Sequence, residues 1–164
     1  MPTSDAVVIA DASPLVHLDR IGRLDLLPAL FSRVTVPAIV ALEVSRGSPH
    51  FRGIDVAHLG WVSVVPDRSD PDIAADPHLH AGEVAALSVA RATPDHLLII
   101  DDLSGRMAAQ RFGLKFIGTA GTVIRARKAG IIPSAATLFD ALANNGFRLA
   151  PDIRKTLLDL VGER

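Results

Sequence analysis

Residues 7–18 have the sequence VVIADASPLVHL, and this stretch decides the fold class. Its first four residues form a short apolar run of the kind that makes a strand buried on both faces. Ser13 and Pro14 then have the residue types favoured at the N-cap and at the first position of a helix. The chain is therefore expected to open with a strand, a tight turn and a helix.

The alternation of strand and helix continues along the chain. Further strands are predicted at 34–36, 61–65, 97–100 and 115–117, and helices at 37–47, 81–92 and 104–112 and from 118 to about 129. Leucines between 15 and 30, interrupted at Gly22, indicate two short helices, and the rest of 48–80 is expected to be loop. Strands separated by helices predict an α/β fold with a parallel sheet covered on both faces.

Length and composition favour a single domain. The chain has 164 residues, of which 49% are hydrophobic and 21% charged, so the whole of it is expected to fold around one core. Segments 135–143 and 153–161 are amphipathic and are joined by a turn at 144–146, which predicts a terminal helical hairpin. The predicted domain is 1–164, with a core at 1–132 and C-terminal helices at 133–164.

Composition also excludes several function classes. The chain has no cysteine, so disulfides, zinc-thiolate sites and thiol nucleophiles are excluded, and any metal must bind oxygen or imidazole. The net charge of -1 gives no global positive field, so nucleic acid would have to be bound by local arginines. The opening residues MPTSDAVVIAD resemble neither a signal peptide nor a membrane anchor, which predicts a cytoplasmic protein with no membrane partner.

Three aspartates directly follow predicted strands. Asp11 follows the first strand, and Asp101 and Asp102 follow the strand at 97–100. Ligands of open parallel sheets bind at the carboxyl ends of the strands, where these acids are expected to lie. Each aspartate could instead cap the next helix. We expect Ser13 and Ser104 to take that role.

Two glutamates fall on the apolar faces of predicted helices. Glu43 lies in the middle of the apolar arc of helix 37–47, and Glu83 shares the apolar stripe of helix 81–92, so both are expected to point inward. The alternatives are a rim residue for Glu43 and a first-turn acid favoured by the helix dipole for Glu83. No capping box is expected for Glu83, because the residue three positions earlier is His80 rather than Ser or Thr.

Inward glutamates and strand-end aspartates would form a cluster of like charges, which is costly unless protons or a cation neutralise it. A divalent cation would neutralise several carboxylates at once. Oxygen ligands suit Mg²⁺ or Mn²⁺, and the usual chemistry of such a site is to activate water and stabilise charge at a phosphate. The cluster therefore predicts phosphodiester hydrolysis.

Four segments, VVIADASPLVHL, VPAIVALEVSRG, AGEVAALSVA and LLIIDDLSGR, followed by FIGTAGTVIRARKAGII, resemble the PIN-domain ribonucleases, the family of the VapC-like toxins. They span most of the chain, and the ending, with GFRL before a last helix, is similar to a little-characterised PIN-related subfamily. In the resemblance the family's acidic ligands match, in chain order, Asp11, Glu43, Glu83 and either Asp101 or Asp102. That choice stays open, because better-known members often have an aromatic residue after the last acid and this chain has Leu103.

Three polar residues are candidates for substrate binding. The resemblance makes Ser13 the hydroxyl neighbour of the first acid. Arg106 lies at a predicted helix start close to Asp102 and could contact a phosphate, although arginines more often form a solvated face. Thr119 is the third candidate.

The resemblance implies a three-layer α/β/α sandwich with a short central sheet and a Mg²⁺- or Mn²⁺-dependent endoribonuclease that hydrolyses RNA. It also implies a toxin of a toxin-antitoxin pair, with a small antitoxin protein as partner and a possible homodimer. The alternative is a catalytically inactive PIN-like nucleic-acid-binding or regulatory module. The discriminating observation is RNA cleavage that needs a divalent cation.

Other site types fit the sequence less well. His78 and His80 lie one residue apart, but the six histidines include no pair at helical ligand spacing. A receiver domain would carry its paired aspartates after the first strand rather than past the middle of the chain. An aspartyl phosphatase would have a second acid where this chain has Ser13.

Overall fold

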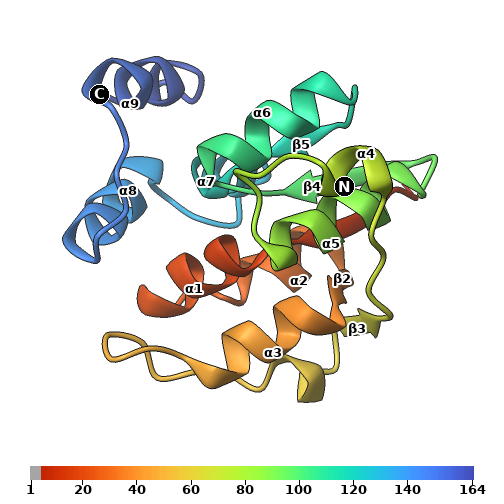
Figure 1. Cartoon of the computed structure of the whole chain (residues 1–164). Helices are drawn as coiled ribbons and strands as arrows, with labels where there is room; N and C mark the ends of the chain where they lie inside the picture. The colour runs from red at the N-terminus through yellow and green to blue at the C-terminus, as the bar shows by residue number, and fades with distance from the viewer. Residues whose placement is uncertain (1–4) are drawn as a thin grey trace.

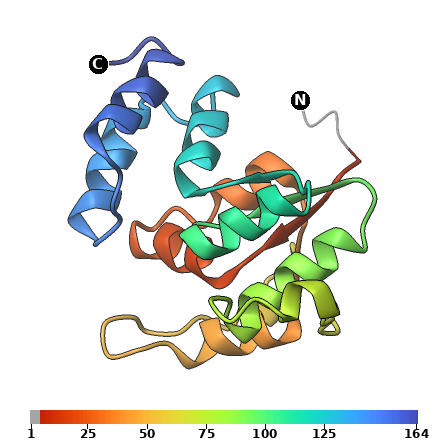
Figure 2. The ribbon, with the colours of Figure 1, turned by 45° about the horizontal axis from the view of Figure 1, so that its top comes forward.

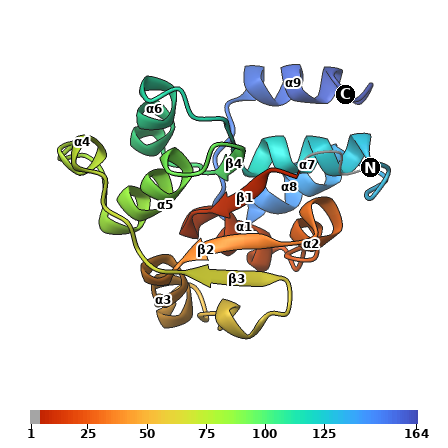
Figure 3. The ribbon, with the colours of Figure 1, turned by 90° about the vertical axis from the view of Figure 1, so that its right-hand side faces the viewer.

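Five strands form one parallel sheet in the computed structural model, which describes residues 5–164. They are β1 (Val7–Ala10), β2 (Val34–Pro37), β3 (Val62–Val65), β4 (His96–Ile99) and β5 (Phe116–Ile117). Their order in the sheet is β3-β2-β1-β4-β5, and Figure 3 shows the first four stacked with β1 between β2 and β4. Because every pairing is parallel, the carboxyl ends of all five strands share one edge.

Helices cover both faces of this sheet, so the expected three-layer α/β/α fold is confirmed (Figure 1). They are α1 (Ala12–Arg20), α2 (Leu26–Phe31), α3 (Ala38–Arg46), α4 (Pro71–Ala74), α5 (Ala81–Arg91), α6 (Leu103–Arg111), α7 (Thr119–Lys128), α8 (Ala135–Asn144) and α9 (Pro151–Asp159). Among residues 5–164, none of the helices is long and apolar enough to cross a membrane.

The side chains of β1 explain why both faces are covered. Successive residues of a strand point to opposite faces. Val8 and Ala10 pack into the core formed with α1, α2, α3 and α7. Ile9 is fully buried in the second core, on the opposite face, with α4, α5 and α6. A strand with no polar face is stable when helices lie on both sides of it.

Helices α8 and α9 lie side by side at one end of the molecule (Figure 2). The guanidinium of Arg154 donates to Asp140 across the pair at 2.8 Å. The chain then turns back and the carboxylate of Glu163 caps α8. It accepts from the backbone N–H groups of residues 135 and 136 at 2.9 Å, from Ser134 Oγ at 3.0 Å and from Arg127 Nε at 2.9 Å. These donors lower the pKa of Glu163 to about 2.

Several local predictions were wrong. Helix α1 begins at Ala12 with Asp11 as its N-cap, so Ser13 lies inside the helix. Asp102 rather than Ser104 is the N-cap of α6, because extended backbone at Asp102 lets its carboxylate accept from the Ser104 N–H. The region expected to be loop at 48–80 also contains α4 and a short 3-10 helix, Val56–His58. Helix α9 begins two residues earlier than expected, with proline at its first position.

Candidate active site

Asp11 is the most deeply buried acid of the site. It directly follows β1, and its N–H donates to the carbonyl of Ile99 on β4 at 3.0 Å, so the sheet fixes its backbone. Its side chain is 4% exposed. Burial, together with the charges of Glu83, Glu43 and Asp101, raises the pKa of Asp11 to about 7, although a hydrogen bond from the Ala12 N–H partly offsets the rise.

Glu83 lies beside Asp11 at the third position of α5. It is buried, as expected from its place in the apolar stripe. Burial and the charge of Asp102 raise its pKa. Its carboxylate also accepts from the His80 N–H at 3.4 Å, so the exclusion of a capping box was wrong. The backbone N–H of the N-cap residue is available whatever its side chain, so this half of a capping box does not need Ser or Thr.

Glu43 reaches the same place from α3, but the expectation that it faces the core was wrong. Its side chain is exposed. The reason is that its part of the helix faces the first turn of α5, where its carboxylate lies against Gly82, rather than the sheet. Partial loss of water there raises the pKa of Glu43, and nearby His80 lowers it.

These acids line one cleft with a volume of about 380 Å³. Its walls are Asp11, Ala12, Ser13, Glu43, His80, Gly82 and Glu83. The structure therefore brings together three of the predicted acids and one predicted hydroxyl. Sequence reasoning did not place His80 here, although its position just before the helix that carries Glu83 was a usable signal.

The adjacent aspartates Asp101 and Asp102 have different partners. Asp101 is half-buried, and its two oxygens accept from Thr119, Oδ1 from the N–H at 2.7 Å and Oδ2 from the hydroxyl at 2.6 Å. Asp102 is exposed and caps α6. Neither lines the cleft, but the charge of Asp101 acts on Asp11 and that of Asp102 acts on Glu83.

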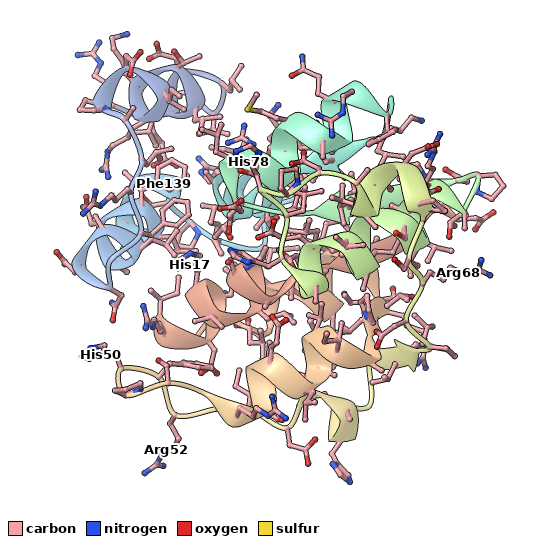
Figure 4. All side chains as sticks on the ribbon, viewed as in Figure 1. His17, His50, Arg52, Arg68, His78 and Phe139 are labelled. Carbon is pink, nitrogen blue, oxygen red and sulfur yellow. The ribbon has the colours of Figure 1, made fainter. Side chains whose placement is uncertain are left out.

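The other two substrate-binding candidates also lie outside the cleft wall. Arg106 is exposed, with its guanidinium carbon 5.9 Å from the centroid of the Phe116 ring. Thr119 is fully buried, and its hydroxyl donates a hydrogen bond to Asp101. Figure 4 shows His50 and Arg52 on the loop after α3 and Arg68 on another side of the molecule, so these side chains are scattered rather than clustered.

The side chains that the cleft offers to a divalent cation are mainly carboxylates. Within residues 5–164, no three His, Cys, Asp or Glu side chains lie close enough together to form a preformed metal-binding site. Three carboxylates nevertheless line the cleft, and the deepest of them is held away from water beside like charges. Mg²⁺ usually keeps several waters and takes only one or two carboxylates directly, so a loose ring of acids suits it. The donor set therefore fits a hard divalent cation bound partly through water.

The comparison with protein families identifies the family to which this fold belongs. A model of the PIN-domain family matches residues 7–163, so the chain belongs to the PIN-domain family. PIN domains are typically nucleases that act on nucleic acid, and they generally use divalent metal ions. Searches among curated proteins and among solved structures found no match.

Proposed function

We propose that this protein is a Mg²⁺- or Mn²⁺-dependent endoribonuclease that hydrolyses phosphodiester bonds of RNA. The observation that supports it best is the placement of buried Asp11 with Glu43 and Glu83 in one cleft at the carboxyl edge of the sheet. A cluster of this kind holds like charges that a cation would relieve. Family membership agrees with nuclease chemistry.

In this proposal Asp11, Glu43 and Glu83 hold the cation, and Asp101 or Asp102 completes the acidic set. A divalent cation in such a site lowers the pKa of bound water and stabilises charge on the phosphate. Asp11 fixes the deep end of the cleft, because the sheet holds its backbone. The hydroxyl of Ser13 is at the cleft wall and can donate to a phosphate oxygen.

The remaining residues act around the cleft. Asp101 holds Thr119 and with it the first turn of α7, which keeps that part of the site rigid. Thr119 is thus proposed to support substrate binding indirectly, through its hydrogen bonds to Asp101, and not to contact the substrate. Arg106, one turn after Asp102 on α6, is proposed to contact the RNA backbone outside the cleft.

We further propose that the protein acts in the cytoplasm as the toxin of a toxin-antitoxin pair and forms homodimers. Its antitoxin would be a small chain with a basic segment, because an arginine can neutralise the cleft carboxylates as a cation does. Co-purification of a small partner with the natural protein would support this proposal, and a native preparation of pure monomer would contradict it.

The test is cleavage of a fluorescently labelled RNA by protein freed of metal with EDTA. Cleavage should be absent without metal, appear with Mg²⁺ or Mn²⁺, and disappear in Asp11→Asn, which keeps shape but removes a ligand charge. Asp95→Asn is the matched control, because Asp95 precedes β4 at the opposite edge of the same sheet. A single-stranded DNA of the same sequence tests whether RNA is preferred.

The alternative is a catalytically inactive PIN-like module that binds nucleic acid or regulates a partner. The specific observation in its favour is that, in the described part of the chain, no three acids already stand at metal-binding distance. RNA binding without cleavage at millimolar Mn²⁺ would favour this alternative over the nuclease.

A further inference from the structure

Gly82 is the residue of the cleft wall with no side chain. It is buried at the second position of α5. A Cβ added to it would lie 2.7 Å from Oε1 of Glu43, 3.0 Å from Oε2 and 3.1 Å from Cδ, and these are its three nearest atoms. The space that a methyl group would fill at residue 82 is therefore taken by the carboxylate of Glu43.

The backbone does not require glycine at this position. Six glycines of the described chain have positive φ, and Gly82 is not one of them. It lies in the first turn of a regular α-helix, where alanine has a higher helix propensity than glycine. Local conformation thus favours alanine at residue 82, whereas the contact with Glu43 disfavours it.

We propose that Gly82 is a positioning residue whose bare α-carbon lets the carboxylate of Glu43 lie in the cleft beside Asp11 and Glu83. Glu43 needs such support, because it is exposed and its long side chain has several rotamers. The proposal rests on the proposed metal-dependent function. It deepens that function by assigning the geometry of one metal ligand to a residue that binds nothing itself.

A methyl group at residue 82 has a specific consequence. A contact of 2.7 Å is shorter than real Cβ atoms make, so the carboxylate must move, and as the end of a flexible side chain it can do so cheaply. The fold should therefore tolerate Gly82→Ala, while the cleft loses the correct placement of one carboxylate. Metal affinity should then fall without a loss of fold stability.

The experiment measures Mn²⁺ binding by isothermal titration calorimetry and the melting temperature in EDTA. For Gly82→Ala, Mn²⁺ affinity should fall about tenfold, whereas the metal-free melting temperature should be unchanged or higher, since alanine favours the helix. Gly121→Ala is the matched control. It lies in the first turn of α7, and the nearest atom to its new Cβ would be Cβ of Ile117 at 3.4 Å, an ordinary contact. This control should bind Mn²⁺ as the natural protein does.

A second variant tests the contact itself. Glu43→Asp withdraws the carboxylate by roughly one carbon-carbon bond, about 1.5 Å, which leaves room for the methyl group. The double variant should therefore bind Mn²⁺ no more weakly than Glu43→Asp alone, so that Gly82→Ala has lost its effect.

Three results would overturn the proposal: unchanged Mn²⁺ affinity in Gly82→Ala, additive losses in the double variant, or no Mn²⁺ binding by the natural protein. RNA cleavage measured in parallel separates this proposal from the proposed function. Mn²⁺ binding that depends on Gly82 without any RNA cleavage would refute the nuclease and leave the positioning role standing.

Discussion

Replacing Asp11 by Asn should stabilise the metal-free protein, although the same change should abolish cleavage. The carboxyl of Asp11 is buried beside Glu43, Glu83 and Asp101, and its pKa is about 7 instead of the ordinary 3.8. Above pH 7 the folded protein must therefore hold an ionised carboxylate in a place that disfavours charge. Asn has nearly the same shape, keeps an oxygen that can accept from the Ala12 N–H, and has no charge.

The size of the expected stabilisation follows from the raised pKa of Asp11. A rise of roughly three pKa units, at about 1.36 kcal/mol each, corresponds to about 4 kcal/mol, which is a ceiling. A buried amide group left short of partners costs about 1–3 kcal/mol of this gain. We expect Asp11→Asn to raise the free energy of unfolding by about 2 kcal/mol at pH 8 in EDTA. In a chain of 164 residues this corresponds to a rise of about 4–8 °C in melting temperature.

The gain should depend on pH in a defined direction. Below pH 3.8 Asp11 is protonated in both the folded and the unfolded protein and costs nothing. Between pH 3.8 and about 7 the folded protein binds the proton more tightly, so its stability falls as pH rises. Above pH 7 the loss is complete. The advantage of Asp11→Asn over the natural protein should therefore grow from pH 4 to pH 7 and then stay constant.

Urea unfolding followed by far-UV circular dichroism at pH 5, 6, 7 and 8 measures this difference. Asp95→Asn is again the control and should track the natural protein at every pH. Saturating Mn²⁺ should reverse the order of stability at pH 8, because a ligand that binds the folded state stabilises it. If the unfolding free energies of Asp11→Asn and the natural protein run parallel from pH 5 to pH 8 in EDTA, the burial argument for Asp11 is refuted.

Three further predictions can be tested in similar melts. Glu83→Gln should stabilise the metal-free protein by about 1 kcal/mol and abolish cleavage, and Mn²⁺ should raise its melting temperature much less than that of the natural protein; equal Mn²⁺ shifts would make Glu83 a structural acid. Asp101→Ala should cost about 3 kcal/mol, since two hydrogen bonds from Thr119 lose a charged acceptor, whereas Asp102→Ala should cost the roughly 1 kcal/mol of a helix cap; the reverse order would contradict their assigned roles. Glu163→Gln should lower the melting temperature much more at pH 7 than at pH 2, because the stability that the lowered pKa of Glu163 provides is present above pH 4.5 and is lost as pH falls through about 2; a deficit of equal size at both values would show that charge is not the cause.

The parts of the fold that could be predicted from the sequence are those that the pattern of apolar residues determines. Apolar runs such as 7–10 have no polar face, so they could form little other than central strands between two layers of helices. Helix boundaries were less predictable, because aspartate, serine and proline compete for the first positions of a helix. The N-cap residues are Asp11 and Asp102 and not the serines two residues later. The reason is that extended backbone after a strand already has the N-cap conformation.

The candidate site was predictable to the extent that strand ends determine it. Asp11 and Asp101 lie at the same edge of the sheet because β1 and β4 are parallel neighbours, a consequence of strand order that residue types suggested in outline. The direction of Glu43 was not predictable from helical periodicity. Periodicity tells which residues share a face, but whether that face meets the sheet or another helix is a tertiary fact.

The adjacent pair Asp101 and Asp102 shows where local sequence ceases to decide a role. The two residues have the same chemistry and consecutive positions, yet their carboxylates accept hydrogen bonds from different elements. Asp101 turns toward β5 and meets Thr119, which follows that strand, whereas Asp102 turns toward α6 and caps it. The difference depends on β5, a strand that comes 14 residues later in the chain and pairs beside β4. The neighbouring strand thus decides which partner each aspartate meets, so tertiary contacts rather than the adjacent sequence distinguish the two carboxylates.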